Sequence, residues 1–243
     1  MRSSSFVAGM RLFLILAIFS SSVAATSFSP PVIPQKTDTQ QILDDLGGVP
    51  CYEGSSFTCV TIEVPLDHFN PADTRTIPVV FAVLPASGSR KGMFVTATGG
   101  PGTAGVQLAD FYTSGFDPSI TDAFDVVFFD QRGVGYSGDL TCPLSANEFY
   151  QQDFRGLTRK QEKGLKKTAN NFATGCVNEL SGSDLLPYLG TKQAIEDLES
   201  FRQMIGDEKI WLYGERYGTQ YAQTYAAVHS DHLAGLILTP QWI

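Results

Sequence analysis

The chain has 243 residues, of which 43% are hydrophobic and 17% are charged, so we expect a packed core and exclude a disordered chain. The formal net charge is −8, and such an acidic surface repels phosphate backbones, so nucleic-acid binding is not expected. The length fits one or two domains.

Residues 1–25 have the pattern of a secretory signal peptide. Arg2 and Arg11 supply positive charge, an apolar run covers residues 12–19, and small residues ending at Ala25 suit cleavage. A membrane-spanning helix needs roughly 20 apolar residues, so we expect export to the periplasm, cell wall or medium and no stable membrane anchor. Pro30, Pro31 and Pro34 then indicate an extended linker, which we place at residues 26–46.

Residues 47–243 alternate strands and helices. Residues 58–64 alternate in polarity like a strand, and apolar runs predict further strands at 77–84, 93–97, 124–129, 210–213 and 236–238. Apolar strands separated by helices predict a mostly parallel, doubly wound sheet that is covered on both faces.

Three helices are predicted from capping and periodicity. Thr191 can cap a helix over residues 192–205, and a second helix covers 217–228. Thr158 and Gln161 match a capping box that opens a helix over 159–176. The lysines of this last helix are interpreted as a solvated face.

Four cysteines in an exported chain indicate disulfides, and four allow three pairings. Cys51 and Cys59 flank a short polar turn that could bring them together, which would leave Cys142 with Cys176. Four free buried thiols are the alternative. The spacing does not resemble a zinc site, and we expect neither a metal nor a cofactor.

Three motifs follow predicted strands, where ligands bind in open α/β sheets. Residues 99–102 (Gly-Gly-Pro-Gly) form a turn whose amides can stabilise an oxyanion, or an ordinary turn. Residues 130–137 (DQRGVGYS) lack the third glycine of a dinucleotide loop, and we interpret them as a structured turn that supports a site. Ser137 has no base nearby in the sequence.

The third motif, residues 213–219 (YGERYGT), has the spacing of the nucleophile elbow G-x-S-x-G. Gly214 and Gly218 take the two glycine positions, and Arg216 stands where the serine would be. Arginine cannot act as an acyl nucleophile, because its guanidinium stays protonated. No complete G-x-S-x-G occurs in the chain.

Together the motifs resemble those of the secreted α/β-hydrolases of the proline iminopeptidase and tripeptidyl aminopeptidase type. The resemblance covers about residues 50–238 and rests on Cys51…Cys59 with VPLDH, then GGPG, DQRGVGYS, Cys142 and GERYGTQYAQTYA. It implies a serine hydrolase acting on peptide N-termini, with oxyanion amides from Gly100 and Tyr217. It also implies disulfides pairing Cys51 with Cys59 and Cys142 with Cys176.

The resemblance places the acid, the histidine and the lid after the sixth strand, so we expect this chain to hold only about strands 1–6 of the fold. His68, His229 and His232 are interpreted as surface or structural residues. Leu236, Ile237 and Leu238 would then form an exposed apolar edge in a product of low stability and solubility.

Two lesions would explain these departures. Residues 238–243 match the translation of a family-like coding sequence after deletion of one base, and serine becomes arginine by one base change. We therefore expect an inactive hydrolase fragment. The alternatives are a selected peptide-binding pseudoenzyme, or an active hydrolase if position 216 and the stop are sequence errors or a second chain completes the site. Substrate preference and oligomeric state stay open.

Overall fold

The computed structural model describes residues 39–138 and 140–239, which belong to one unit starting at Thr37. The predicted signal peptide, the prolines of the predicted linker and residues 240–243 lie outside the described residues. None of the described helices has the length and apolar character needed to cross a membrane.

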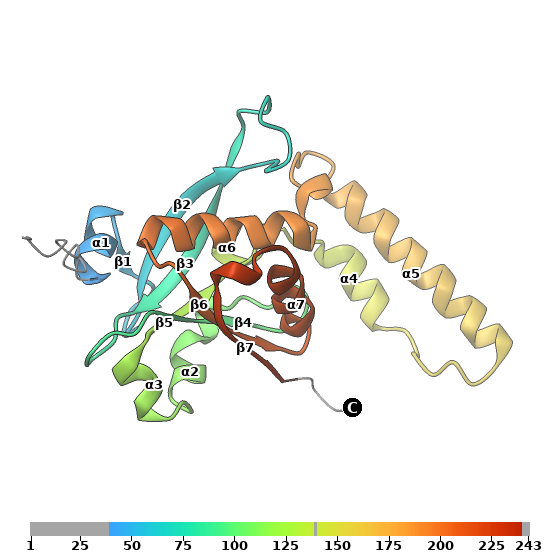
Figure 1. Ribbon diagram of the computed structural model, residues 1–243. Helices are drawn as coiled ribbons and strands as arrows, with labels where there is room; N and C mark the ends of the chain where they lie inside the picture. Colours follow the sequence, from blue (N-terminus) through green and yellow to red (C-terminus); the bar gives the residue numbers. More distant parts are fainter. Residues whose placement is uncertain (1–38, 139, 240–243) are drawn as a thin grey trace, which may run out of the picture. The chain divides into compact units, whose positions relative to one another are not determined.

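A seven-stranded mixed sheet is the centre of this unit (Figure 1), with the order β1-β2-β3-β5-β4-β6-β7. Its strands are β1 (Val49–Pro50), β2 (Thr58–Pro65), β3 (Thr76–Leu84), β4 (Met93–Ala97), β5 (Asp125–Phe129), β6 (Ile210–Glu215) and β7 (Leu233–Thr239). The pairs β5–β4, β4–β6 and β6–β7 are parallel, whereas β1–β2, β2–β3 and β3–β5 are antiparallel. The predicted doubly wound α/β sheet is confirmed, and its parallel part comprises β5, β4, β6 and β7.

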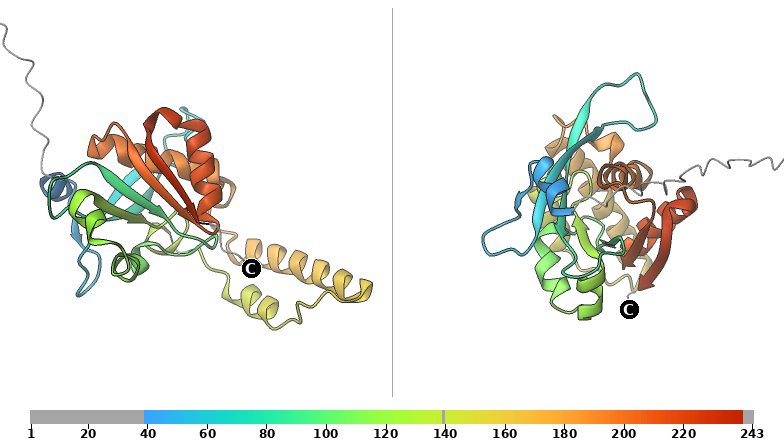
Figure 2. Two further views of the ribbon diagram at one scale, coloured as in Figure 1. Left: turned by 60° about the horizontal axis from the view of Figure 1, so that its bottom comes forward. Right: turned by 60° about the vertical axis from the view of Figure 1, so that its left-hand side comes forward.

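Helices cover both faces of the sheet, as the apolar strands predict. Along β3, Val79, Phe81 and Val83 belong to one core cluster while Val80 and Ala82 belong to another, because successive side chains point to opposite faces. The first cluster packs against α6 (Thr191–Ile205) and α7 (Gly218–Val228), and the second against α2 (Ala109–Thr113) and α3 (Pro118–Ala123) (Figure 2).

Helix α1 (Thr39–Asp45) occupies residues that the sequence analysis assigned to the linker. Leu43 is fully buried in the first core cluster, and the Thr39 hydroxyl donates a 2.8 Å hydrogen bond to Asp125 on β5. The predicted linker boundary at residue 46 is therefore wrong, because burial of Leu43 and the Thr39 bond attach this segment to the sheet.

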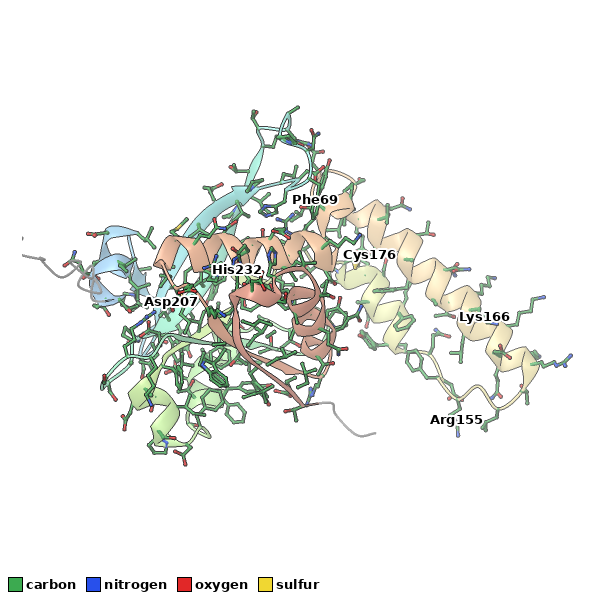
Figure 3. All side chains as sticks on the ribbon, in the orientation of Figure 1. Phe69, Arg155, Lys166, Cys176, Asp207 and His232 are labelled. Carbon is green, nitrogen blue, oxygen red and sulfur yellow. A yellow bond between two sulfur atoms is a disulfide. The ribbon has the colours of Figure 1, made fainter. Side chains whose placement is uncertain are left out.

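Helices α4 (Pro143–Tyr150) and α5 (Arg159–Glu179) form a hairpin, which we call the α4–α5 hairpin. As predicted, the Thr158 side chain accepts a hydrogen bond from the Gln161 amide at the start of α5. No residue of α5 is buried, and Figure 3 shows Arg155 and Lys166 at the far end of the hairpin from Cys176. The disulfide between Cys142 and Cys176 joins its two helices, and a second disulfide joins Cys51 and Cys59.

The start of α6 differs from the prediction. Its N-cap residue is Gly190, not Thr191, and no side chain caps it. The Thr191 hydroxyl lies 2.9 Å from the Tyr217 hydroxyl instead. Thr191 is the first residue of the helix and not its N-cap, and this tertiary contact ties the start of α6 to the turn before α7.

Candidate active site

The turn between β6 and α7 has the geometry of a nucleophile elbow. Strand β6 enters it, α7 leaves it, and Arg216 has a φ of 54°. Arg216 is the only non-glycine residue with positive φ in the described ranges, and this conformation is unfavourable for a residue with a Cβ. The sequence thus predicts both the position and the strain of this turn.

The two elbow glycines are required by close backbone contacts. A Cβ on Gly218 would lie 1.9 Å from the carbonyl oxygen of Ala97, the last residue of β4. A Cβ on Gly214 would lie 2.5 Å from the carbonyl oxygen of Gly218. Only glycine fits at these positions, so helix α7 can begin directly against the end of the sheet.

The Arg216 side chain lies against Gly99, the first residue of the glycine-rich turn at residues 99–102. A Cβ on Gly99 would be 2.5 Å from the Arg216 Cβ and 2.8 Å from its Cδ. The Arg216 Nε lies 3.2 Å from the Glu215 Oε1, and 52% of the arginine side chain is exposed. Burial and a hydrogen bond to Glu215 raise the pKa of Tyr112 to about 12, so its phenol stays protonated at neutral pH.

The two predicted oxyanion donors each adjoin Arg216 or a residue that it contacts. Tyr217 follows Arg216 directly, and Gly100 follows Gly99, which Arg216 contacts. Gly100 is exposed, with a φ of 136°, and precedes a cis peptide bond to Pro101. Within the described part of the chain, neither backbone N–H donates to a protein acceptor. Their role toward an oxyanion stays a prediction.

The turn that follows β5 supports the site through Asp130. This carboxylate is fully buried and accepts hydrogen bonds from the amides of Val106 at 2.9 Å and Tyr136 at 2.8 Å. Burial raises the pKa of Asp130, while these amides oppose the rise. Ser137 is also buried: its hydroxyl donates to the Asp130 carbonyl at 2.7 Å and accepts from the Val80 amide at 2.9 Å. Both functions of the hydroxyl are used, so Ser137 is a structural residue.

Arg132 forms a buried ion pair that the sequence analysis missed. Its guanidinium donates to both Asp197 carboxylate oxygens, at 2.8 and 2.5 Å, and to the carbonyls of Pro65, Leu66 and Tyr188. Its pairing with Asp197 therefore fastens the β5 turn to α6. His68 also contacts Asp197, through Nε2 at 2.8 Å.

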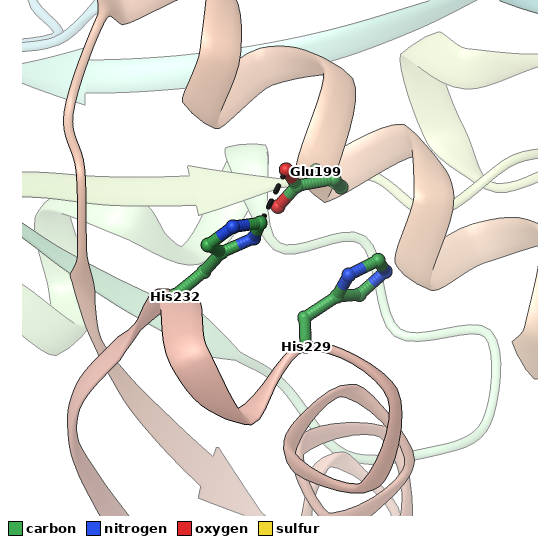
Figure 4. A group of neighbouring side chains, drawn as sticks. All are labelled: Glu199, His229 and His232. Carbon is green, nitrogen blue, oxygen red and sulfur yellow. Dashed lines mark ion pairs between the residues drawn. The ribbon is translucent and has the colours of Figure 1, made fainter.

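The two other histidines follow the end of α7, an 11-residue helix of roughly 16 Å that begins at the elbow. Figure 4 shows both beside Glu199. His229 lies 3.0 Å from Glu196, and His232 lies 3.2 Å from Glu199. Ligand atoms of Glu199, His229 and His232 come within 4.8 Å of one another, as in a metal site.

The hydrogen bonds of Glu199 argue against metal binding there. Its carboxylate already accepts from Arg202 at both oxygens, from Gln203 and from Tyr225. A carboxylate has about four lone-pair positions, and four donors occupy them. The cluster is therefore a structural network between α6 and the end of α7.

Comparisons with known proteins agree with this geometry. The family described as alpha/beta hydrolase fold matches residues 93–241. The chain is 28% identical over 183 residues to Serine protease Hip1 of Mycobacterium tuberculosis, covering 74% of this chain and 35% of that protein. It is 28% identical over 187 residues to Tripeptidyl aminopeptidase of Streptomyces lividans, covering 74% and 34%.

A solved carboxyl esterase from Bacillus coagulans superposes with a TM-score of 0.39 at 16% identity, covering 73% of this chain and 43% of the esterase. The chain thus spans about a third of the length of the curated relatives named here. The family match covers more than half of the chain and includes both the elbow and the glycine-rich turn, so this chain belongs to the α/β-hydrolase family.

Proposed function

We propose that this chain is the elbow-bearing part of an exported aminopeptidase-type serine hydrolase that cannot perform acyl transfer as written. Arg216 at positive φ between Gly214 and Gly218 is the observation that carries this proposal. The backbone places residue 216 where a nucleophile stands in G-x-S-x-G, but a guanidinium has no lone pair for attack.

The histidines support the same conclusion. The chain has three, and each lies beside a carboxylate of α6. In a catalytic triad the base binds its acid through Nδ1 and the serine through Nε2. His68 uses Nε2 for Asp197, whereas His229 and His232 lie at the far end of α7. None of the three is arranged as a base for residue 216.

Export and peptide substrates complete the proposal. Two disulfide bonds form between cysteines in the described part of the chain, and such bonds persist in oxidising compartments. The relatives are named as a serine protease and a tripeptidyl aminopeptidase, which supports peptides as the substrate class. The acid, the base and the lid would belong to the remaining length of such proteins.

Labelling with a fluorophosphonate probe tests the proposal, because only an activated serine reacts. We expect no labelling of the 243-residue chain and no hydrolysis of a chromogenic tripeptide anilide, while full-length tripeptidyl aminopeptidase serves as the positive control. Arg216→Ser should also remain unlabelled, since no histidine is placed as its base. Labelling of the unchanged chain would contradict the loss of acyl transfer, and labelling of Arg216→Ser would show that a base is present.

A peptide-binding pseudoenzyme is the second candidate. The unpaired amides of Gly100 and Tyr217 favour it, because donors that bind an oxyanion in a hydrolase can bind a stable anion when no nucleophile is present.

A further inference from the structure

We propose that the elbow of this chain is a carboxylate-binding site, in which Arg216 acts together with the amides of Gly100 and Tyr217. The ligand class is a peptide that ends in a free carboxylate. The inference rests on the proposed function in one respect: residue 216 binds and does not attack.

The terminal nitrogens of the Arg216 guanidinium are not used within the described residues, unlike those of the buried arginines. Arg90, Arg132 and Arg202 each use terminal nitrogens on carboxylates or carbonyls. Arg216 pairs only through Nε, with Glu215, and neither of its terminal nitrogens has a partner among residues 39–138 and 140–239. Half of the side chain is exposed, so these donors are accessible to a ligand.

The backbone fixes where this guanidinium is anchored. The positive φ of Arg216 and the packing of Gly218 against Ala97 hold the Cα at the end of the sheet. The aliphatic part of the side chain lies against Gly99, the residue before Gly100. The side chain that carries the guanidinium therefore starts one residue before the Tyr217 amide and packs against the residue before Gly100. Guanidinium and amide N–H groups are the donors that bind planar carboxylates.

Local charge favours a carboxylate over a phosphate. Glu215 lies 3.2 Å from the Arg216 Nε and offsets part of the positive charge. The whole chain carries −8, which further disfavours dianions and polyanions. A singly charged carboxylate matches one guanidinium with a smaller penalty than a dianion.

The matched probes are N-acetyl-triglycine, which has a free carboxylate, and its C-terminal amide. Titration of the 15N-labelled 243-residue chain should shift the NMR signals of the Gly100 and Tyr217 amides and the Arg216 Nε–H with the acid but not with the amide. We expect Arg216→Gln to weaken binding of the acid by about tenfold or more, because a charge-assisted bidentate contact is lost.

Arg155→Gln is the control variant, because it removes one positive charge from an exposed side chain on the α4–α5 hairpin and should leave the affinity unchanged. Equal binding of acid and amide, an unchanged affinity in Arg216→Gln, or tighter binding of inorganic phosphate than of the acid would overturn the inference. Probe labelling reports separately on acyl transfer, so failure of the proposed function and failure of carboxylate binding are distinguishable.

Discussion

Replacement of Gly218 by alanine tests whether the elbow is held by close backbone packing. The added Cβ would lie 1.9 Å from the Ala97 oxygen and 2.7 Å from the Ala97 carbon, whereas real Cβ atoms essentially never come within 3.0 Å of such atoms. Helix α7 and strand β4 must therefore separate by about 1 Å, at the point where Ala97 pairs with Gly214. Overpacking costs about 1–3 kcal/mol, and because backbone opposes the Cβ we expect the upper end, about 3 kcal/mol.

Urea unfolding followed by far-UV circular dichroism measures this loss. The control is Gly164→Ala in α5, where the new Cβ meets nothing within 4 Å. Alanine in place of an exposed helical glycine should stabilise the chain by about 0.5–1 kcal/mol. If both variants unfold at the same urea concentration, the steric argument for the elbow is refuted.

Two further predictions concern Glu199 and the α4–α5 hairpin. Burial raises the pKa of Glu199, but hydrogen bonds from donors including Arg202 and Tyr225 outweigh it and lower the pKa from 4.5 to about 2. The carboxylate therefore stabilises the fold above pH 4.5, and up to about 3 kcal/mol is lost as the pH falls toward 2. In urea titrations, Glu199→Gln should be destabilised at pH 7 and approach the unchanged chain near pH 2; a constant difference would contradict this. Replacing both Cys142 and Cys176 by serine removes this disulfide and leaves Cys51–Cys59 intact; it should speed amide exchange in α4 and α5 but not in the sheet, because α5 has no buried residue. A uniform change in exchange rates would contradict this.

The sequence predicts the central strands because their apolar runs are uninterrupted. The predicted strand at 93–97 has the same bounds as β4, and every one of its residues is buried. The order of the strands in the sheet, however, cannot be predicted from local sequence patterns. Strand β3 lies between β2 and β5, and its antiparallel pairing with β5 depends on residues more than 40 positions apart. Neither hydrophobic period nor capping signals report such long-range pairing.

The buried ion pairs were missed although the sequence contains a signal for them. Asp197 lies three residues after Ala194 and one before Leu198, so it falls on the apolar face of α6. Arg202 lies four residues after Leu198 on the same face. A charged residue at a core position needs a partner, but only the folded chain shows that Asp197 meets Arg132, 65 residues away.

The elbow shows why architecture can be predicted where chemistry cannot. The strained turn is enforced by Gly214, Gly218 and the end of β4, through contacts that do not involve the side chain of residue 216. The elbow backbone is therefore compatible with arginine as well as serine, and the surrounding support from Asp130 is complete. The position of the site follows from the glycines, whereas the reaction also depends on the side chain at residue 216 and on a base for it, and these glycine contacts determine neither.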